Sequence, residues 1–256
     1  MTKLDLAEIV KERYTPLKIT TEAFAKANYL SQRVCELAEQ PLELSFFLLG
    51  KAEDMVIRDI YLGREQNVNA SFCEISESGV IGSVLDIQEN YDLQILGWGH
   101  SHACWNNFYS NTDTITLKER ERLWGVLKEV EISEDYLKNI NLENSNEQYQ
   151  SLDLDEGLIN IFSEPVYSES ALTTIDSYSE EMIVGLFQGM TFNAKADEPY
   201  CVVAYSQRDE EPVLLGELDY EIIEAGNCNY SPETNKQVLD EQLKERVIGL
   251  HYLLGD

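Results

Sequence analysis

The sequence GWGHSHACWNNFYSNTD, residues 97–113, holds two of the three histidines of the chain. The mostly apolar run LQIL precedes it, so residues 93–102 are predicted to form a strand. Side chains two positions apart on a strand project from the same face. His100 and His102 are therefore expected to direct their imidazoles to one point. Two imidazoles begin a zinc site, and a catalytic zinc ion usually takes a third protein ligand.

The third ligand is sought downstream, where the sequence continues through SNTD. Ser110 and Asp113 have the spacing of a helix N-cap and the residue three positions later, as in a capping box. That structural role explains both residues without a metal ion. It leaves the pair of histidines unexplained.

Hydrophobic periodicity predicts alternating helices and strands on both sides of this stretch. Helices are predicted at residues 21–39, 79–90, 112–130 and 231–254, with Thr20 or Thr21 capping the first and Pro232 in the first turn of the last. Strands are predicted at residues 42–49, ended by Gly50, and in DMVIRDIYLG, NVNASFCEIS, MIVGLFQGMTFNA, YCVVAYSQ and PVLLGELDYEIIE. This alternation with a mixed sheet indicates a single α/β or α+β domain.

Residues 132–179 differ in composition, with ten acidic residues and one basic residue. Asn and Ser lie between the charges, so we predict an acidic insertion rather than a core element.

Composition and charge exclude several classes of partner. The net charge of −28 repels nucleic-acid phosphates and anionic membrane surfaces, so neither is predicted as a direct partner. The N-terminus lacks the pattern of a secretory signal and no apolar run is long enough to span a bilayer, which predicts a cytoplasmic protein. The five cysteines include no C-x-x-C pair, which argues against a disulfide framework and a cysteine-type zinc site.

The full spacing, H-x-H, seven residues and then S-x-x-D, resembles the signature of the JAMM (MPN+) zinc metalloprotease family. That family also has a glutamate on an earlier strand, seven positions before a glycine, and PLELSFFLLGK supplies Glu43 and Gly50. The alternative interpretation is that Glu43 is an ordinary surface residue of the strand. The apolar residues around Glu43 disfavour this interpretation. The resemblance implies a curved mixed β-sheet flanked by helices, similar to the cytidine-deaminase fold. It also implies a domain core at about residues 20–225, interrupted by the acidic insertion. Deaminase activity itself is disfavoured, because H-x-E and P-C-x-x-C are both missing.

The resemblance also implies the roles of the site residues. His100, His102 and Asp113 would bind Zn²⁺, with Glu43 as general base and acid and Ser110 as a hydrogen-bond donor to the oxyanion. Cys104 is an alternative candidate for the third ligand. The competing interpretation is that Cys104 is a small packed side chain near the site. The activity implied is hydrolysis of an amide or isopeptide bond at the C-terminus of a ubiquitin-like protein or its conjugates.

One departure from the family concerns the substrate. Family members that cleave ubiquitin chains commonly have proline directly after the second histidine, whereas this chain has Ala103. Two alternatives therefore stay open. One is a zinc hydrolase of the same fold that processes a sulfur-carrier-like protein or a small molecule, and the other is a non-catalytic MPN scaffold. His251, in the predicted last helix, is interpreted as a structural or surface residue.

Overall fold

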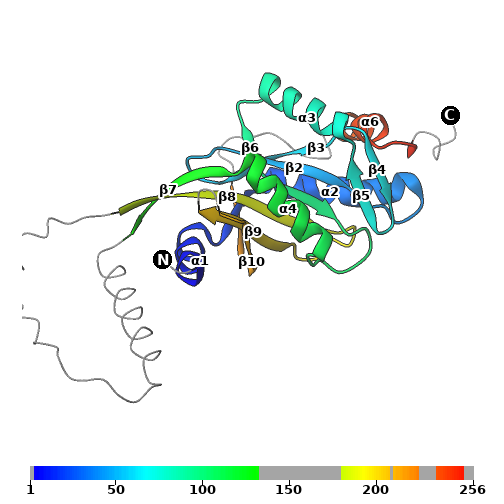
Figure 1. Cartoon of the computed structure of the whole chain (residues 1–256). Coiled ribbons are helices and arrows are strands. Elements are labelled where there is room, and N and C mark those ends of the chain that lie inside the picture. The colour runs from blue at the N-terminus through cyan, green and yellow to red at the C-terminus, as the bar shows by residue number, and fades with distance from the viewer. Residues whose placement is uncertain (1–2, 133–179, 208–209, 225–234, 251–256) are drawn as a thin grey trace, which may run out of the picture. The chain divides into compact units, whose positions relative to one another are not determined.

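The computed structural model contains a mixed β-sheet with helices packed against it (Figure 1). The structure describes residues 3–132, 180–207, 210–224 and 235–250. The helices are α1 (Lys3–Tyr14), α2 (Thr21–Ala38), α3 (Glu77–Asn90), α4 (Asn111–Trp124) and α6 (Lys236–Arg246). The strands are β1 (Leu17–Thr20), β2 (Ser45–Gly50), β3 (Ile57–Leu62), β4 (Gln66–Asn69), β5 (Phe72–Ile75), β6 (Gln94–Ser101), β7 (Val126–Ile132), β8 (Glu180–Phe192), β9 (Tyr200–Gln207), β10 (Val213–Leu218) and β11 (Tyr220–Ile223).

The main sheet is strongly curved. Its strands follow the order β10-β9-β8-β6-β2-β3-β1-β11, with β7 paired to β8 beside this path. The two strands at opposite ends of the order, β10 and β11, are separated in the sequence only by Asp219. The sheet therefore curls until its edges nearly meet. This confirms the predicted mixed α/β class with a curved mixed sheet flanked by helices.

The strand that carries the histidines lies in the middle of the sheet. β6 is antiparallel to β2, with Ser45 opposite His100, and parallel to β8. Because neighbours flank β6 on both sides, its backbone groups are paired and its position is fixed.

Helices cover the two faces of the sheet differently. Neighbouring side chains of β2 point to opposite faces, so Phe46 and Phe47 belong to different layers. Phe47 packs in a cluster below α3, and Trp98, which is opposite it on β6, packs in a cluster below α4. These two clusters consist of Phe47, Leu49, Tyr61, Ile75 and Ile87, and of Trp98, Leu117, Phe187, Val202 and Ala204. On the other face, the Phe46 ring lies 5.7 Å from Phe192, which contacts Phe24 of α2.

The helix preceding β2 forms as its sequence predicts. The Thr20 hydroxyl accepts a hydrogen bond from the Ala23 amide, 3.3 Å away, and caps α2. The buried residues of α2 recur at helical spacing along the face turned to the sheet, and Glu39 ends the helix with a left-handed backbone, φ 52°. The prediction of this helix and of its Thr20 cap is confirmed.

Most other predicted elements are present, with corrections at their ends. The helix predicted at 79–90 and the strands in DMVIRDIYLG, MIVGLFQGMTFNA and YCVVAYSQ are confirmed as α3, β3, β8 and β9. The strand predicted at 42–49 begins only at Ser45, so Glu43 precedes it. The last helix is shorter than predicted, and Pro232 and His251 lie outside the described residues.

Three predicted elements have the predicted type and differ in their extent or pairing. The helix predicted at 112–130 ends at Trp124, because the backbone of Gly125 leaves the helical conformation with ψ 131° and VLKEVEI continues as β7. NVNASFCEIS forms a separate hairpin, β4–β5, rather than one strand. PVLLGELDYEIIE forms β10 and β11, which pair with different neighbours.

Among the described residues, those from 3 to 128 and from 184 onward belong to one compact unit, and residues 129–132 and 180–183 belong to another. Most of the predicted acidic insertion at 132–179 lies outside the described residues, so its role and the single-domain organisation stay predictions. None of the helices in the described part of the chain is long and apolar enough to cross a membrane.

Candidate metal centre

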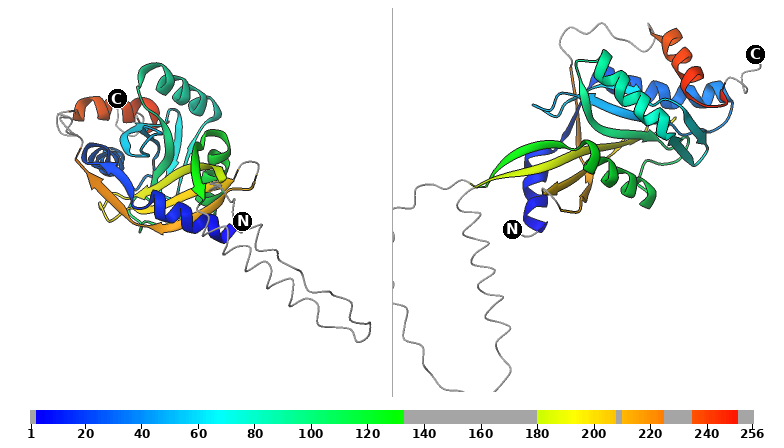
Figure 2. Two further views of the ribbon diagram at one scale, coloured as in Figure 1. Left: turned by 90° about the vertical axis from the view of Figure 1, so that its left-hand side faces the viewer. Right: turned by 45° about the horizontal axis from the view of Figure 1, so that its top comes forward.

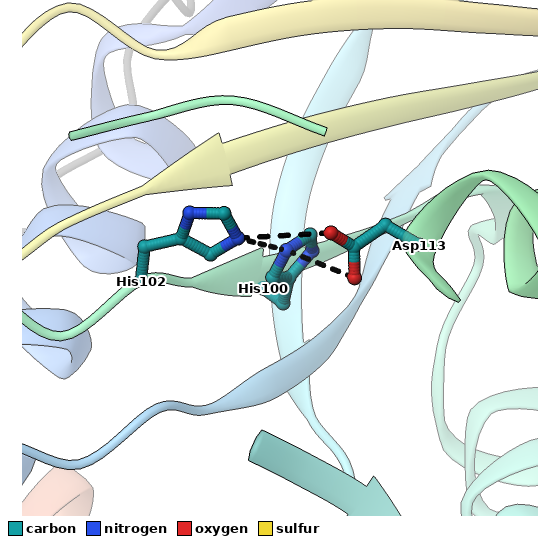
Figure 3. A group of neighbouring side chains, drawn as sticks. All are labelled: His100, His102 and Asp113. Carbon is teal, nitrogen blue, oxygen red and sulfur yellow. Dashed lines mark hydrogen bonds and ion pairs between the residues drawn. The ribbon is translucent and has the colours of Figure 1, made fainter. Parts of the chain in front are cut away.

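Two histidines and one aspartate converge at the end of β6 (Figure 3). His100 lies on β6, His102 follows the last residue of that strand, and Asp113 lies in the first turn of α4. The Nε2 atoms of the histidines are 2.9 Å apart. Asp113 Oδ1 lies 3.4 Å from His100 Nε2, and Asp113 Oδ2 lies 3.7 Å from His102 Nε2. The sequence therefore predicted correctly which three side chains meet.

Backbone contacts fix the turn that carries His102. Its amide donates to the Phe192 carbonyl at 2.8 Å, and its carbonyl accepts from the Trp105 amide at 2.8 Å. Between these contacts Ala103 is buried and has a left-handed backbone, φ 45°. Proline requires φ near −65°, so this turn in its observed conformation excludes a proline at position 103.

The start of α4 holds Asp113 in place. The Ser110 hydroxyl accepts from the Asp113 amide at 3.2 Å, and Asp113 Oδ2 accepts from the Ser110 amide at 2.8 Å. This is the capping box predicted from SNTD. Since Ser110 Oγ acts as an acceptor there, its own proton stays available to a ligand. The cap and a role in the site are therefore compatible.

Glu43 lies in the same cavity as His102, Ser110 and Asp113, whose volume is about 440 Å³. The residue is 8% exposed, which rules out the surface alternative. Burial raises the pKa of Glu43 to about 7, with His102 opposing the shift and Asp113 adding to it. A carboxyl group with this pKa can both accept and return a proton near neutral pH.

The ligand atoms are electrostatically coupled. Burial lowers the pKa of His100, and a hydrogen bond with Asp113 only partly compensates. For His102, burial is outweighed by Asp113 and the Asn106 carbonyl, so its pKa is raised. Burial alone would raise the pKa of Asp113, yet hydrogen bonds with both histidines and Ser110 lower it far below its usual range. Asp113 is therefore an anion at any physiological pH.

The donor set fits a zinc ion. His102 Nδ1 lies 3.2 Å from the Asn106 carbonyl, which can only accept, so the neutral ring has its lone pair on Nε2, toward His100 and Asp113. His100 is oriented by stacking on Trp98, with ring centroids 4.7 Å apart, and its buried Nδ1 has no hydrogen-bond partner. Tetrahedral zinc with ligands at about 2.0–2.1 Å requires ligand atoms about 3.3–3.4 Å apart. The observed separations of 2.9, 3.4 and 3.7 Å lie within a few tenths of that distance.

Cysteine does not belong to this group in the described part of the chain. Cys104 is exposed on the turn after His102, and the ligand atoms that lie within 4.8 Å of one another come from His100, His102 and Asp113. The alternative of Cys104 as a ligand therefore has no support, and its alternative role as a packed side chain is wrong as well.

Sequence reasoning missed three contributors to the site. They are Asn106, whose carbonyl orients His102, Tyr109, whose ring lies 5.6 Å from that of His100, and Arg120, which lines the cavity. A pattern in the sequence could have indicated Arg120. Thr112, Thr116 and Arg120 are each four positions apart and therefore share one face of α4.

No protein-family model and no curated protein matches the chain.

Proposed function

We propose that this protein is a zinc-dependent hydrolase of amide or isopeptide bonds, related to the JAMM metalloproteases. The convergence of His100, His102 and Asp113 beside a buried glutamate carries the proposal. This is a three-ligand set of the catalytic type, which keeps a coordination position open. When bound there, zinc would supply Lewis-acid activation of a water molecule and of the substrate carbonyl.

The protein's own residues supply the proton transfers. Glu43 accepts the proton of the attacking water and returns it to the amine that leaves, since an unprotonated amide nitrogen is a poor leaving group. Its raised pKa, about 7 without metal, suits both directions of transfer. Ser110 donates its free hydroxyl proton to the oxyanion, a contact typically contributing about 3 kcal/mol to transition-state stabilisation.

Aromatic side chains around the cavity favour a polypeptide substrate. Phe72, Trp105 and Phe108 line it and are 43%, 60% and 48% exposed. Exposed aromatic rings in one place are typical of surfaces that bind a protein partner. A ubiquitin-like protein or its conjugate is therefore the proposed partner, acting in the cytoplasm, with a sulfur-carrier-like protein as the second candidate.

Substitution of Glu43 tests this function. Glu43→Gln preserves size and removes basicity, so zinc should stay near one ion per chain while turnover falls by about two to four orders of magnitude. Glu74→Gln is the matched control, because Glu74 is an exposed carboxylate that lines the same cavity. Metal content and single-turnover cleavage of ubiquitin-like substrates are measured on one preparation.

Three outcomes separate the readings. His102→Ala should lose zinc, since two protein ligands hold it weakly. Zinc loss in Glu43→Gln would make Glu43 a ligand rather than a proton carrier. If the protein binds stoichiometric zinc but cleaves no ubiquitin-like, sulfur-carrier-like or small amide substrate, the proposed hydrolase is excluded and the non-catalytic scaffold is the remaining interpretation.

A further inference from the structure

The proposed chemistry does not use Arg120, a charged residue that lines the cavity. Arg120, Thr112 and Thr116 line the cavity from one face of α4. The same cavity contains His102 and Asp113. A cation therefore lines the same cavity as two of the candidate metal ligands.

The Arg120 guanidinium is surrounded by aromatic rings. Its Cζ atom lies 4.6 Å from the centroid of Trp98, 5.7 Å from that of Phe47 and 6.0 Å from that of Trp124. Cation–π contacts of this kind stabilise the charge through the ring faces. They do not satisfy the N–H donors, which lie at the edge of the guanidinium plane.

One of those donors is left unsatisfied. Nη1 of Arg120 is buried and has no hydrogen-bond partner, and no carboxylate among the described residues forms an ion pair with this side chain. Burial lowers the pKa of Arg120 to about 10, so the group remains a cation at neutral pH. A partly buried cation with an unsatisfied donor and no ion-pair partner is destabilising, and such a group in a cavity is a candidate for ligand binding.

We propose that Arg120, assisted by Thr112 and Thr116, binds a carboxylate of the substrate beside the metal centre. The term substrate rests on the proposed hydrolase, whereas the binding of a carboxylate does not. Arginine donates two parallel hydrogen bonds to a carboxylate, which matches its planar geometry. A doubly charged phosphate fits less well, because Glu43, Glu74 and Asp113 line the same cavity and would repel it more strongly.

This inference narrows the substrate class to amides that have a carboxylate close to the scissile bond. Two sources have the same chemistry, the free C-terminal carboxylate of a peptide and the acidic side chain of an internal residue. Since the chain has a net charge of −28, its long-range field repels both. Affinity for an anion must therefore come from local donors such as Arg120.

Calorimetric titration of the zinc-loaded, full-length protein with matched probes tests the inference. N-benzoylglycine and its neutral amide represent the terminal carboxylate. Capped peptides that differ only in Glu or Gln represent the internal one. The carboxylate probe of at least one pair should bind about 10- to 100-fold more tightly than its neutral partner, as expected for hydrogen bonds to a charged group. The pair that shows the preference identifies the source.

Two substitutions on α4 assign the preference to a residue. Arg120→Gln should reduce it to near one, whereas Arg122→Gln should leave it unchanged. Arg122 has the same charge two positions along the helix, with an exposed side chain that lies 3.9 Å from Glu211. Arg120→Lys keeps the charge and loses the two-pronged geometry, so it should retain part of the preference. It also replaces Arg120→Gln in the test if that variant does not fold.

The metal-free His102→Ala variant separates this inference from the proposed hydrolase. Retention of the preference there assigns it to Arg120 even if the protein cleaves nothing. Absence of any preference in the parent protein would overturn the inference. An unchanged preference in Arg120→Lys and Arg120→Gln, equal loss in Arg122→Gln, or loss of the preference in His102→Ala would each overturn it as well.

Discussion

Ser101, the residue between the two histidines, connects them to the segment that contains Glu43. Its side chain is fully buried, and its Oγ accepts a hydrogen bond from the Leu44 amide at 2.9 Å. The Ser101 amide donates to the Leu44 carbonyl at 2.8 Å. These two bonds hold the segment that contains Glu43 against the metal centre. Ser101 is therefore a positioning residue.

Ser101→Ala should lower the free energy of unfolding by about 1–3 kcal/mol, because it leaves a buried amide unsatisfied. Ser83→Ala is the control. Ser83, a residue of α3, is equally buried, and its hydroxyl accepts a hydrogen bond from the Arg64 amide at 3.0 Å. Denaturant titration should give similar losses for both variants. Cleavage should fall only in Ser101→Ala, and equal activity losses would contradict its positioning role.

The raised pKa of Glu43 has a consequence for stability in the metal-free protein. Between the ordinary pKa of a glutamate, 4.5, and about 7, the folded protein keeps a proton on Glu43 that the unfolded chain has lost. Stability contributed by this group must therefore fall as the pH rises through that window. Glu43→Gln cannot titrate, so its unfolding free energy should fall less than that of the parent between pH 5 and pH 8. Parallel curves from denaturant titrations would contradict the buried, proton-binding glutamate.

At this scale the family resemblance implied one site made of the two histidines, Asp113, Ser110 and Glu43, and the structure places these residues together. Sequence reasoning missed Arg120 and Asn106. The role of Arg120 depends on Trp98 and Trp124, which approach it only in the folded structure. Asn106 acts through its backbone carbonyl, which its residue type does not reveal.

The start of α4 combines a structural and a chemical role in one element. Ser110 and Asp113 cap the helix through each other's amides, and both line the cavity. The positive end of the helix dipole further stabilises the Asp113 carboxylate. The element thus fixes the charge and the position of the third ligand together.

Ser110→Ala should cost about 1 kcal/mol of stability through the lost cap. Ser76→Ala is the control, because Ser76 caps α3 by accepting from the Gly79 amide at 2.9 Å and lies outside the cavity. Thermal unfolding should shift similarly in both variants. Only Ser110→Ala should also lose about 10²–10³-fold in single-turnover rate, the usual effect of removing an oxyanion donor. A rate equal to that of Ser76→Ala would restrict Ser110 to its cap.

Elements with clear periodicity, such as α2, were predicted to within a residue or two. β7 was not, because its charged residues Lys128, Glu129 and Glu131 are common on helix surfaces and only pairing with β8 makes it a strand. α1 and β1 gave no usable pattern, and β1 is positioned by β3 and β11, which are distant in the sequence. Figure 2 shows the ribbon of the protein from two further sides.

At the scale of the whole molecule, the metal centre is expected to be independent of the acidic segment. The residues of the site belong to the unit that contains residues 3–128 and the described residues from 184 onward. Residues 133–179 connect the paired strands β7 and β8 in the sequence. Their acidic, polar composition offers little apolar area for a core. A chain in which a short Gly-Ser turn replaces this segment should fold and bind one zinc ion. Loss of zinc or of cooperative unfolding would show that the segment supports the core.

Zinc K-edge X-ray absorption of the full-length, zinc-loaded protein tests the metal centre most directly. Coordination by His100, His102 and Asp113 predicts only nitrogen and oxygen neighbours at about 2.0–2.1 Å, with the outer-shell scattering of two imidazoles. His102→Ala should abolish the bound-zinc spectrum. A sulfur neighbour at about 2.3 Å, or a spectrum without imidazole scattering, would contradict this centre.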